Sequence, residues 1–128
     1  LTSDPRSQTL EIPKDDSKSN SIYTEGLRLV AFQTPAMEAT TVKCHFLGTF
    51  DLTTADASVT WLPILTSAGT QLFITVSASV AQLVALDDEE AAQISHFPRV
   101  IIQATTTSAA VPVVQATAKR TFRPVIRA

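Results

Sequence analysis

The sequence predicts an all-β domain: an antiparallel β-sandwich or jelly roll of about eight strands, with at most one short helix and an extended N-terminal arm. Short runs of alternating apolar and polar residues recur along the chain, with turn-forming residues between them. The connections between these runs are too short for the crossover helices of a parallel sheet. Thr is frequent, and its β-branched side chain suits a pleated surface.

Composition limits the classes of protein that need be considered. The 128 residues are enough for one domain. The formal net charge is −2, so the chain has no overall basic excess for binding nucleic acid or an anionic membrane, and we expect neither as a partner. A single cysteine excludes an intramolecular disulfide.

The first 25 residues differ in composition from the rest of the chain. They are polar and poor in core-forming residues, so we expect an extended N-terminal arm or linker over 1–25 and the β-sandwich domain over 26–128. Within this part only Thr9 to Ile12 alternates like a strand, and Pro13 ends it. Such an arm is either disordered or lies along a neighbouring molecule, and both interpretations stay open.

Strand 41–50, which follows an apolar strand at 26–33, has the clearest alternation in the chain. The alternation places Cys44 and Phe46 on one face and His45 on the other. Adjacent thiol and imidazole groups that face opposite ways cannot form a catalytic dyad. We therefore predict a buried structural cysteine.

Three segments follow the polar loop 51–58. Strand 59–65 contains Pro63, which cannot donate to a sheet ladder, so this strand is predicted to be an edge strand or bent. After a Ser-Ala-Gly turn, a strand at 70–77 alternates again. Segment 81–86 is compatible with a strand or a helix.

An acidic run predicts the start of a short helix. Asp87 can cap the free N–H groups, and Glu90 can complete a capping box, which predicts one or two helical turns to about Ile94. The alternative is a single longer helix from Ser79 to Ser95.

Two strands complete the prediction. The apolar centre of 98–106 indicates a strand that is covered on both faces. The segment 113–127 is predicted as one long strand, or as two strands with a break at Pro124.

Basic residues concentrate in this last segment and form the candidate partner-binding set. On a regular strand three of them share one face, as a strip that would bind acidic groups of a protein or phosphates. The alternative is a solvated outer face or edge strand, where charge prevents aggregation. The candidates are Lys119, Arg120, Arg123 and Arg127, with Lys119, Arg123 and Arg127 on the shared face.

Other patterns give little sign of catalysis or of metal binding. The two histidines and Cys44 lack the close spacing of a zinc site. Asp51 and Asp56 flank a loop, but without the repeated spacing typical of calcium loops. Three glycines cannot supply a phosphate-binding loop. We therefore predict no catalytic residues, no cofactor and no metal, and a protein that is not an enzyme.

Trp61 is the candidate for a second kind of site. An exposed indole can stack on a sugar ring, and Tyr23 and the loop 51–58 would complete such a site. The alternative for Trp61 is packing in the core or at a sheet edge.

From Gly26 to Arg127 the order of these features resembles the small, jelly-roll-like β-sandwich virion structural proteins of tailed bacteriophages. The resemblance implies a non-enzymatic, homo-oligomeric subunit of the virion, used for head decoration or in the neck or fibre and bound to capsid, neck or tail proteins. It identifies no functional residues. The segments that carry it are GLRLVAFQTPAM, FLGTFD, TWLPIL, TVSASVAQLVALD, FPRVIIQATT and TFRPVIR.

The same order is similar to discoidin-like and carbohydrate-binding jelly rolls, which implies as an alternative a module for recognising host-surface glycans. The loop after Phe50 reads Asp-Leu-Thr-Thr here and lacks the Ser-Asp-Gly pattern of such modules.

Overall fold

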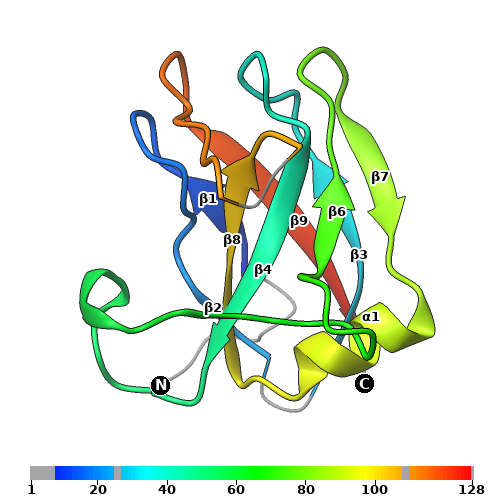
Figure 1. The fold of residues 1–128 in the computed structure, drawn as a ribbon. Helices are drawn as coiled ribbons and strands as arrows, with labels where there is room; N and C mark the ends of the chain where they lie inside the picture. The colour runs from blue at the N-terminus through cyan, green and yellow to red at the C-terminus, as the bar shows by residue number, and fades with distance from the viewer. Residues whose placement is uncertain (1–7, 25–26, 108–109, 128) are drawn as a thin grey trace.

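The computed structural model describes residues 8–24, 27–107 and 110–127, and confirms the predicted sandwich of two antiparallel sheets (Figure 1). The four-stranded sheet consists, in spatial order, of β1 (Leu10–Ile12), β9 (Arg120–Arg127), β3 (Arg28–Thr34) and β7 (Gln82–Ala85). The five-stranded sheet consists of β2 (Ile22–Tyr23), β8 (Arg99–Thr105), β4 (Lys43–Thr49) and β5 (Leu62–Pro63), with β6 (Phe73–Thr75) also paired to β4.

Large apolar side chains fill the space between the two sheets. Phe32 from β3, Phe46 from β4 and Phe122 from β9 are all fully buried, and the rings of Phe32 and Phe46 lie 5.5 Å apart. Burying a side chain of this size stabilises the fold by about 1.5–3 kcal/mol. The core therefore depends on residues contributed by both sheets.

The structure corrects the expectation of an N-terminal arm. Residues 8–24 belong to the sandwich, because β1 pairs with β9 and β2 pairs with β8. Leu10, Ile12 and Ile22 are fully buried. The alternation of Thr9 to Ile12 did indicate β1, but β2 has two residues, too few for a periodic pattern, so the rest of this part resembles a linker in sequence. Residues 1–7 and 25 of the expected arm lie outside the described residues.

Segment 81–86 and the acidic run after it form a strand followed by a helix. Strand β7 covers 82–85, so the single long helix is not formed. Helix α1 (Asp88–Ser95) begins with the predicted capping box: Asp87 accepts the Glu90 N–H at 2.7 Å, and Glu90 accepts the Asp87 N–H at 3.0 Å. The helix packs against β3 at one end of the sandwich (Figure 1).

The last strand is shorter than predicted but is not broken at Pro124. Strand β9 starts at Arg120, and Pro124 lies within it, opposite Phe32 of β3. The Leu86 N–H donates to the Val30 carbonyl, so by alternation the backbone groups of Phe32 face β7, and the position opposite Phe32 on β9 does not have to donate to β3. Proline is tolerated in a strand at such a position.

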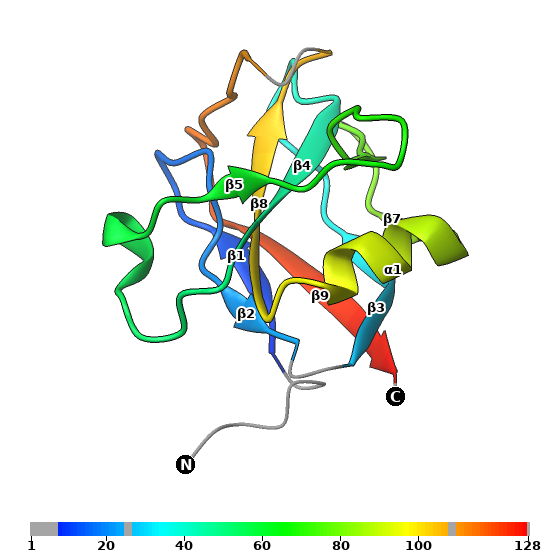
Figure 2. The ribbon, with the colours of Figure 1, turned by 60° about the horizontal axis from the view of Figure 1, so that its bottom comes forward.

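The outer faces of the two sheets are very different. On the five-stranded sheet His45 is 4% exposed and Ile101 1% exposed, although both point away from the core. The chain from residue 51 to 66, which includes the short 3-10 helix η2 (Asp56–Ser58), crosses this face (Figure 2). On the four-stranded sheet Arg123 and Arg127 are exposed. One sheet is thus covered on both faces, and the other has an open outer face.

Gly48 provides a test of the packing. A Cβ atom at position 48 would lie 2.6 Å from Cγ of Phe97, which is too close for a normal contact. We predict that Gly48→Ala lowers the free energy of unfolding by about 1–3 kcal/mol, because the ring must shift. Urea denaturation measures the change. In the double variant with Phe97→Ala, which removes Cγ and the ring, the loss of stability should be smaller than the sum of the two single losses, and strict additivity would contradict this packing.

Candidate functional site

A buried arginine organises the covered outer face of the five-stranded sheet. Arg99, on β8, is 2% exposed. Its Nε donates to Oγ of Ser21 at 3.1 Å, and its Nη1 donates to the carbonyl of Asp51 at 2.9 Å. Its Nη2 donates to the carboxylate of Asp56. A buried charge is costly unless it is paired and hydrogen-bonded, and these partners satisfy Arg99 on each of its nitrogens.

Two aromatic rings lie near the same guanidinium. Its central carbon is 5.5 Å from the ring centroid of Tyr23 and 5.3 Å from that of Trp61. The indole N–H of Trp61 donates to the carbonyl of Asp56 at 3.0 Å. Cation–π contacts of this kind contribute about 0.5–2 kcal/mol. Trp61 is therefore held in one orientation, partly buried against Arg99.

The carboxylates of the loop 51–58 accept hydrogen bonds from groups of the chain itself. Asp51 accepts the N–H groups of Thr53 and Thr54, each at 3.0 Å. The Thr54 hydroxyl and these N–H groups lower the pKa of Asp51 to about 2. Burial alone would raise the pKa of Asp56, but hydrogen bonds from Ser21 and Arg99 outweigh it and lower that pKa. Both aspartates stabilise the loop. Within the described residues, no three His, Cys, Asp or Glu side chains are grouped to hold a metal ion.

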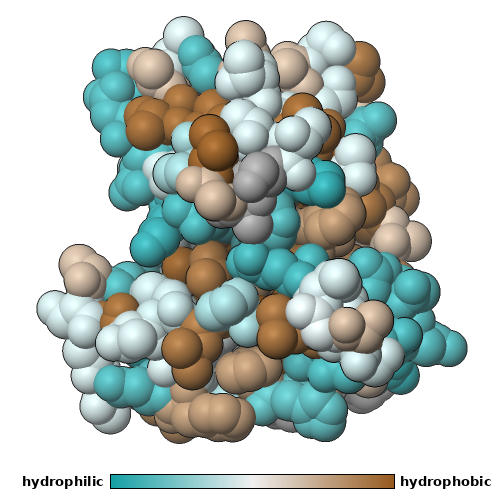
Figure 3. Space-filling view, in the orientation of Figure 1, coloured by the Kyte–Doolittle hydropathy of each residue, from teal (hydrophilic) through white to brown (hydrophobic). Residues whose placement is uncertain are grey.

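Trp61 lines a groove of about 420 Å³ beside this cluster. The wall opposite Trp61 is the hairpin 13–20, with Asp16 and Lys18, and Ile101 of β8 also lines the groove. Figure 3 shows the groove as a notch on the left side of the molecule. We call it the Trp61 groove.

The hairpin wall of the Trp61 groove is held from behind by Gln115, which is fully buried. Its carbonyl accepts the Asp15 N–H, and its N–H donates to the Asp16 carbonyl, both at 2.9 Å. One carboxylate oxygen of Asp16 accepts the N–H groups of Ser17 and Lys18. Lys18 lines the groove, and its ammonium makes no ion pair with a described residue.

The predicted basic strip lies on the open face of the four-stranded sheet. Arg123 and Arg127 are exposed there, and within the described part of the chain neither has an acidic partner. The structure adds Arg28 of β3, which pairs across the sheet with Arg127 and lies 3.9 Å from Asp88. We call Arg28, Arg123 and Arg127 the basic face.

The other two predicted basic residues have partners within the fold. Lys119 is exposed, and its ammonium lies 3.8 Å from Glu11. Arg120 does not belong to the strip, because it points to the opposite side of the strand, as strand alternation requires. There it donates to Glu38 at 3.1 Å and to the carbonyl of Ala36 at 2.9 Å. Arg120 ties loop 35–42 to β9.

The structure confirms that Cys44 and His45 face opposite ways. Cys44 is fully buried in the core, and this burial raises the pKa of its thiol. His45 lies on the covered outer face, with Nδ1 2.9 Å from the hydroxyl of Thr105. Burial and then the charge of Lys43 lower the pKa of His45.

The sequence prediction did not identify Arg99, although a signal for it was present. Arg99 starts an apolar strand that was itself predicted to be covered on both faces. A charge in such a strand needs buried partners, and short polar residues of the supposed arm supply one of them, Ser21. The loop 51–58 contributes the other two partners, Asp51 and Asp56.

Comparison with protein-family models, with curated proteins and with solved structures gives no match. Among the described residues, no helix is long and apolar enough to cross a membrane.

The Arg99 cluster predicts a large loss of stability on truncation. Arg99→Met should lower the free energy of unfolding by about 3 kcal/mol, since the Asp51 carbonyl loses the guanidinium that bonds it and the carboxylate of Asp56 loses its opposite charge. The emission of Trp61, the single tryptophan, should shift to longer wavelength as its ring gains contact with water. Urea denaturation followed by fluorescence measures both. The exposed Arg123→Met is the matched control, expected within about 0.5 kcal/mol. Equal effects of the two variants would contradict a structural role for Arg99.

Proposed function

We propose that this protein is a non-enzymatic structural subunit of a tailed-phage virion that attaches to an acidic surface of a neighbouring virion protein through its basic face. The observation that carries the attachment is the open outer face of the four-stranded sheet. Among the described residues, its three arginines share one acidic partner, Asp88, which lies 3.9 Å from Arg28.

The position of these arginines favours an anionic partner. Arg28 and Arg127 are directly paired across β3 and β9, and like charges in that relation destabilise a sheet. A carboxylate-bearing surface would offset the repulsion, because guanidinium groups bind carboxylates in bidentate geometry. The chain as a whole carries a net charge of −2, so this face differs in sign from the protein average.

Apolar groups accompany the arginines on the same face. Leu83 of β7 is 73% exposed, and Val125 of β9 is partly exposed between Arg123 and Arg127. Arginine together with apolar side chains is typical of protein interfaces. The virion setting rests on the resemblance of the chain from Gly26 to Arg127 to phage β-sandwich proteins, which are structural and oligomeric.

The basic face gives a direct test. The double variant Arg123→Glu, Arg127→Glu should abolish incorporation into particles, because it reverses the charge that meets the acidic partner. Particles purified from infected cells and probed with an antibody measure incorporation. The double variant Lys14→Glu, Lys18→Glu changes the net charge equally on the hairpin 13–20 and should still be incorporated. Absence of the wild-type protein from particles would overturn the proposal.

A second candidate function is glycan binding at the Trp61 groove, as in a host-recognition module. The observation that favours it is an indole held in place by Arg99 and Asp56 on the wall of a groove with charged groups at its rim. Aromatic rings stack on sugar rings, and polar neighbours then fix the orientation of the sugar.

A glycan array tests this second function. Wild type should bind a subset of glycans, and Trp61→Ala should lose that binding through the loss of the stacking surface. Phe50→Ala is the control, because Phe50 is a 69% exposed aromatic residue that packs on Phe97 and does not line the groove. No binding by wild type, or equal binding by both variants, would assign Trp61 to packing.

A further inference from the structure

Side chains cap the edges of both sheets on the side formed by β1 and β2. At the edge of β1, the Glu11 N–H donates to the side-chain oxygen of Asn20, and the Glu11 carbonyl accepts the Asn20 N–H. At the edge of β2, the side-chain amide of Gln8 both accepts the Tyr23 N–H and donates to the Tyr23 carbonyl. These edges cannot pair with another strand.

The opposite side of the sandwich is protected less completely. There β5 carries Pro63, and the ammonium of Lys43, which belongs to the neighbouring strand β4, lies over β6, 3.9 Å from the ring centroid of Phe73. Proline and lysine are usual protections of an edge strand. Strand β7 has neither, and the segment 79–86 that contains it has no charged residue, no proline and no glycine.

The backbone of β7 has hydrogen-bonding groups available for another strand. The N–H of Leu86 donates to the carbonyl of Val30, and the bonds of an antiparallel strand alternate in direction. The backbone N–H and C=O groups of Val84 therefore point toward β3. Those of Leu83 and Ala85 point the other way, toward the open side of the strand. Both of these residues are exposed. Among the described residues, no group bonds to them from the open side.

We propose that β7 is a dimerisation edge, at which a second copy of this chain adds its own β7 in antiparallel register centred on Val84. In this register Leu83 faces Ala85 of the second copy, and Ala85 faces its Leu83, so the outward backbone groups of both strands are paired. The large side chain of each Leu83 thus lies next to the small side chain of Ala85 from the other copy. The two four-stranded sheets become one sheet of eight strands.

Charge also favours a second copy in this orientation. The C-terminal end of β7 leads into Asp87 and Asp88, at the start of α1. At the other end of the strand, Arg123 lines a groove of about 460 Å³ together with Gln82 and Leu83. Antiparallel pairing places the acidic end of each copy beside the basic end of the other, which is the arrangement that attracts.

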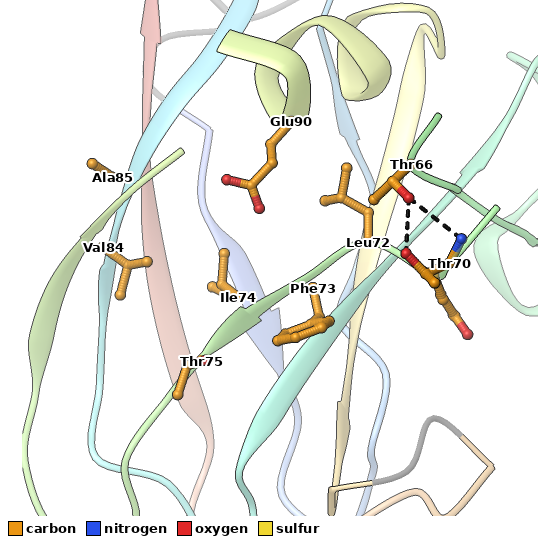
Figure 4. A pocket seen from close by; sticks show the side chains of 10 residues that line it. Thr66, Thr70, Leu72, Phe73, Ile74, Thr75, Val84, Ala85 and Glu90 are labelled. Atoms are coloured by element: carbon orange, nitrogen blue, oxygen red, sulfur yellow. Dashed lines mark hydrogen bonds between the residues drawn. The ribbon is translucent and has the colours of Figure 1, made fainter. Parts of the chain in front are cut away.

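The space next to β7 is consistent with this contact. A gap of about 310 Å³ lies between β7 and β6, lined by Val84 and Ala85 on one side and by Ile74 and Thr75 on the other (Figure 4). Glu90 points toward the gap from α1 (Figure 4). A second copy on β7 would cover the apolar side chains at the open side of this gap.

The dimer edge adjoins the basic face, since Leu83 and Arg123 line the same groove, but its test measures self-association of the purified protein and not incorporation into particles. Sedimentation velocity over a range of protein concentrations should show a monomer–dimer equilibrium for wild type. Leu83→Lys should weaken association roughly tenfold or more, because two ammonium groups enter the interface. Leu62→Lys, the same change on the exposed edge strand β5, should leave association unchanged.

The register has its own test in cysteine crosslinking, since native Cys44 is fully buried. Residues opposite each other in a non-hydrogen-bonded pair have Cα atoms about 4.5 Å apart, so Val84→Cys should form a disulfide-linked dimer on mild oxidation. The copies of Leu83 are offset by two residues and lie beyond the roughly 7 Å limit for a disulfide, so Leu83→Cys should not crosslink. A wild type that stays monomeric, or a dimer unaffected by Leu83→Lys, would overturn the proposal.

Discussion

The covered side of this sandwich depends on the hydrogen bonds and the ion pair of one buried guanidinium, that of Arg99. It lies beneath the 51–66 segment, where a charge is tolerated only with complete pairing. Its partners come from the residue before β2 and from the segment 51–66, through Ser21, Asp56 and Trp61. Three parts of the chain that are far apart in sequence, at Ser21, in the segment 51–66 and in β8, are thereby joined.

The division between a covered and an open sheet also determines where the molecule can bind. Coverage by the 51–66 segment creates the Trp61 groove, because the loop and the hairpin 13–20 leave a hollow over Ile101. The uncovered sheet displays the basic face and ends at β7. Groove, face and edge are thus consequences of one architecture in which the chain covers a single sheet. They are chemically distinct: an indole with charged neighbours, a set of guanidinium groups, and an uncharged strand edge.

Most strands could be predicted because their patterns are local. Alternation located β4, and the acidic run located the capping box of α1, since each depends on neighbours within a few residues. Alternation also indicated β1, but not that it pairs with β9, and β2 was missed because a strand of two residues has no measurable period. The shared face of Arg123 and Arg127 followed from alternation along one strand. The contribution of Arg28 did not, because it requires the pairing of β3 with β9.

By itself the sequence determined the fold class, the opposite orientations of Cys44 and His45, and the basic character of the last strand, since these follow from the period of two along a strand. The tertiary structure decided which sheet is covered, and with it the burial of Arg99. It also decided that the N-terminal residues 8–24 complete both sheets. The physical reason is that burial and strand pairing join residues far apart in the chain, and no local pattern records which distant partner a side chain will meet.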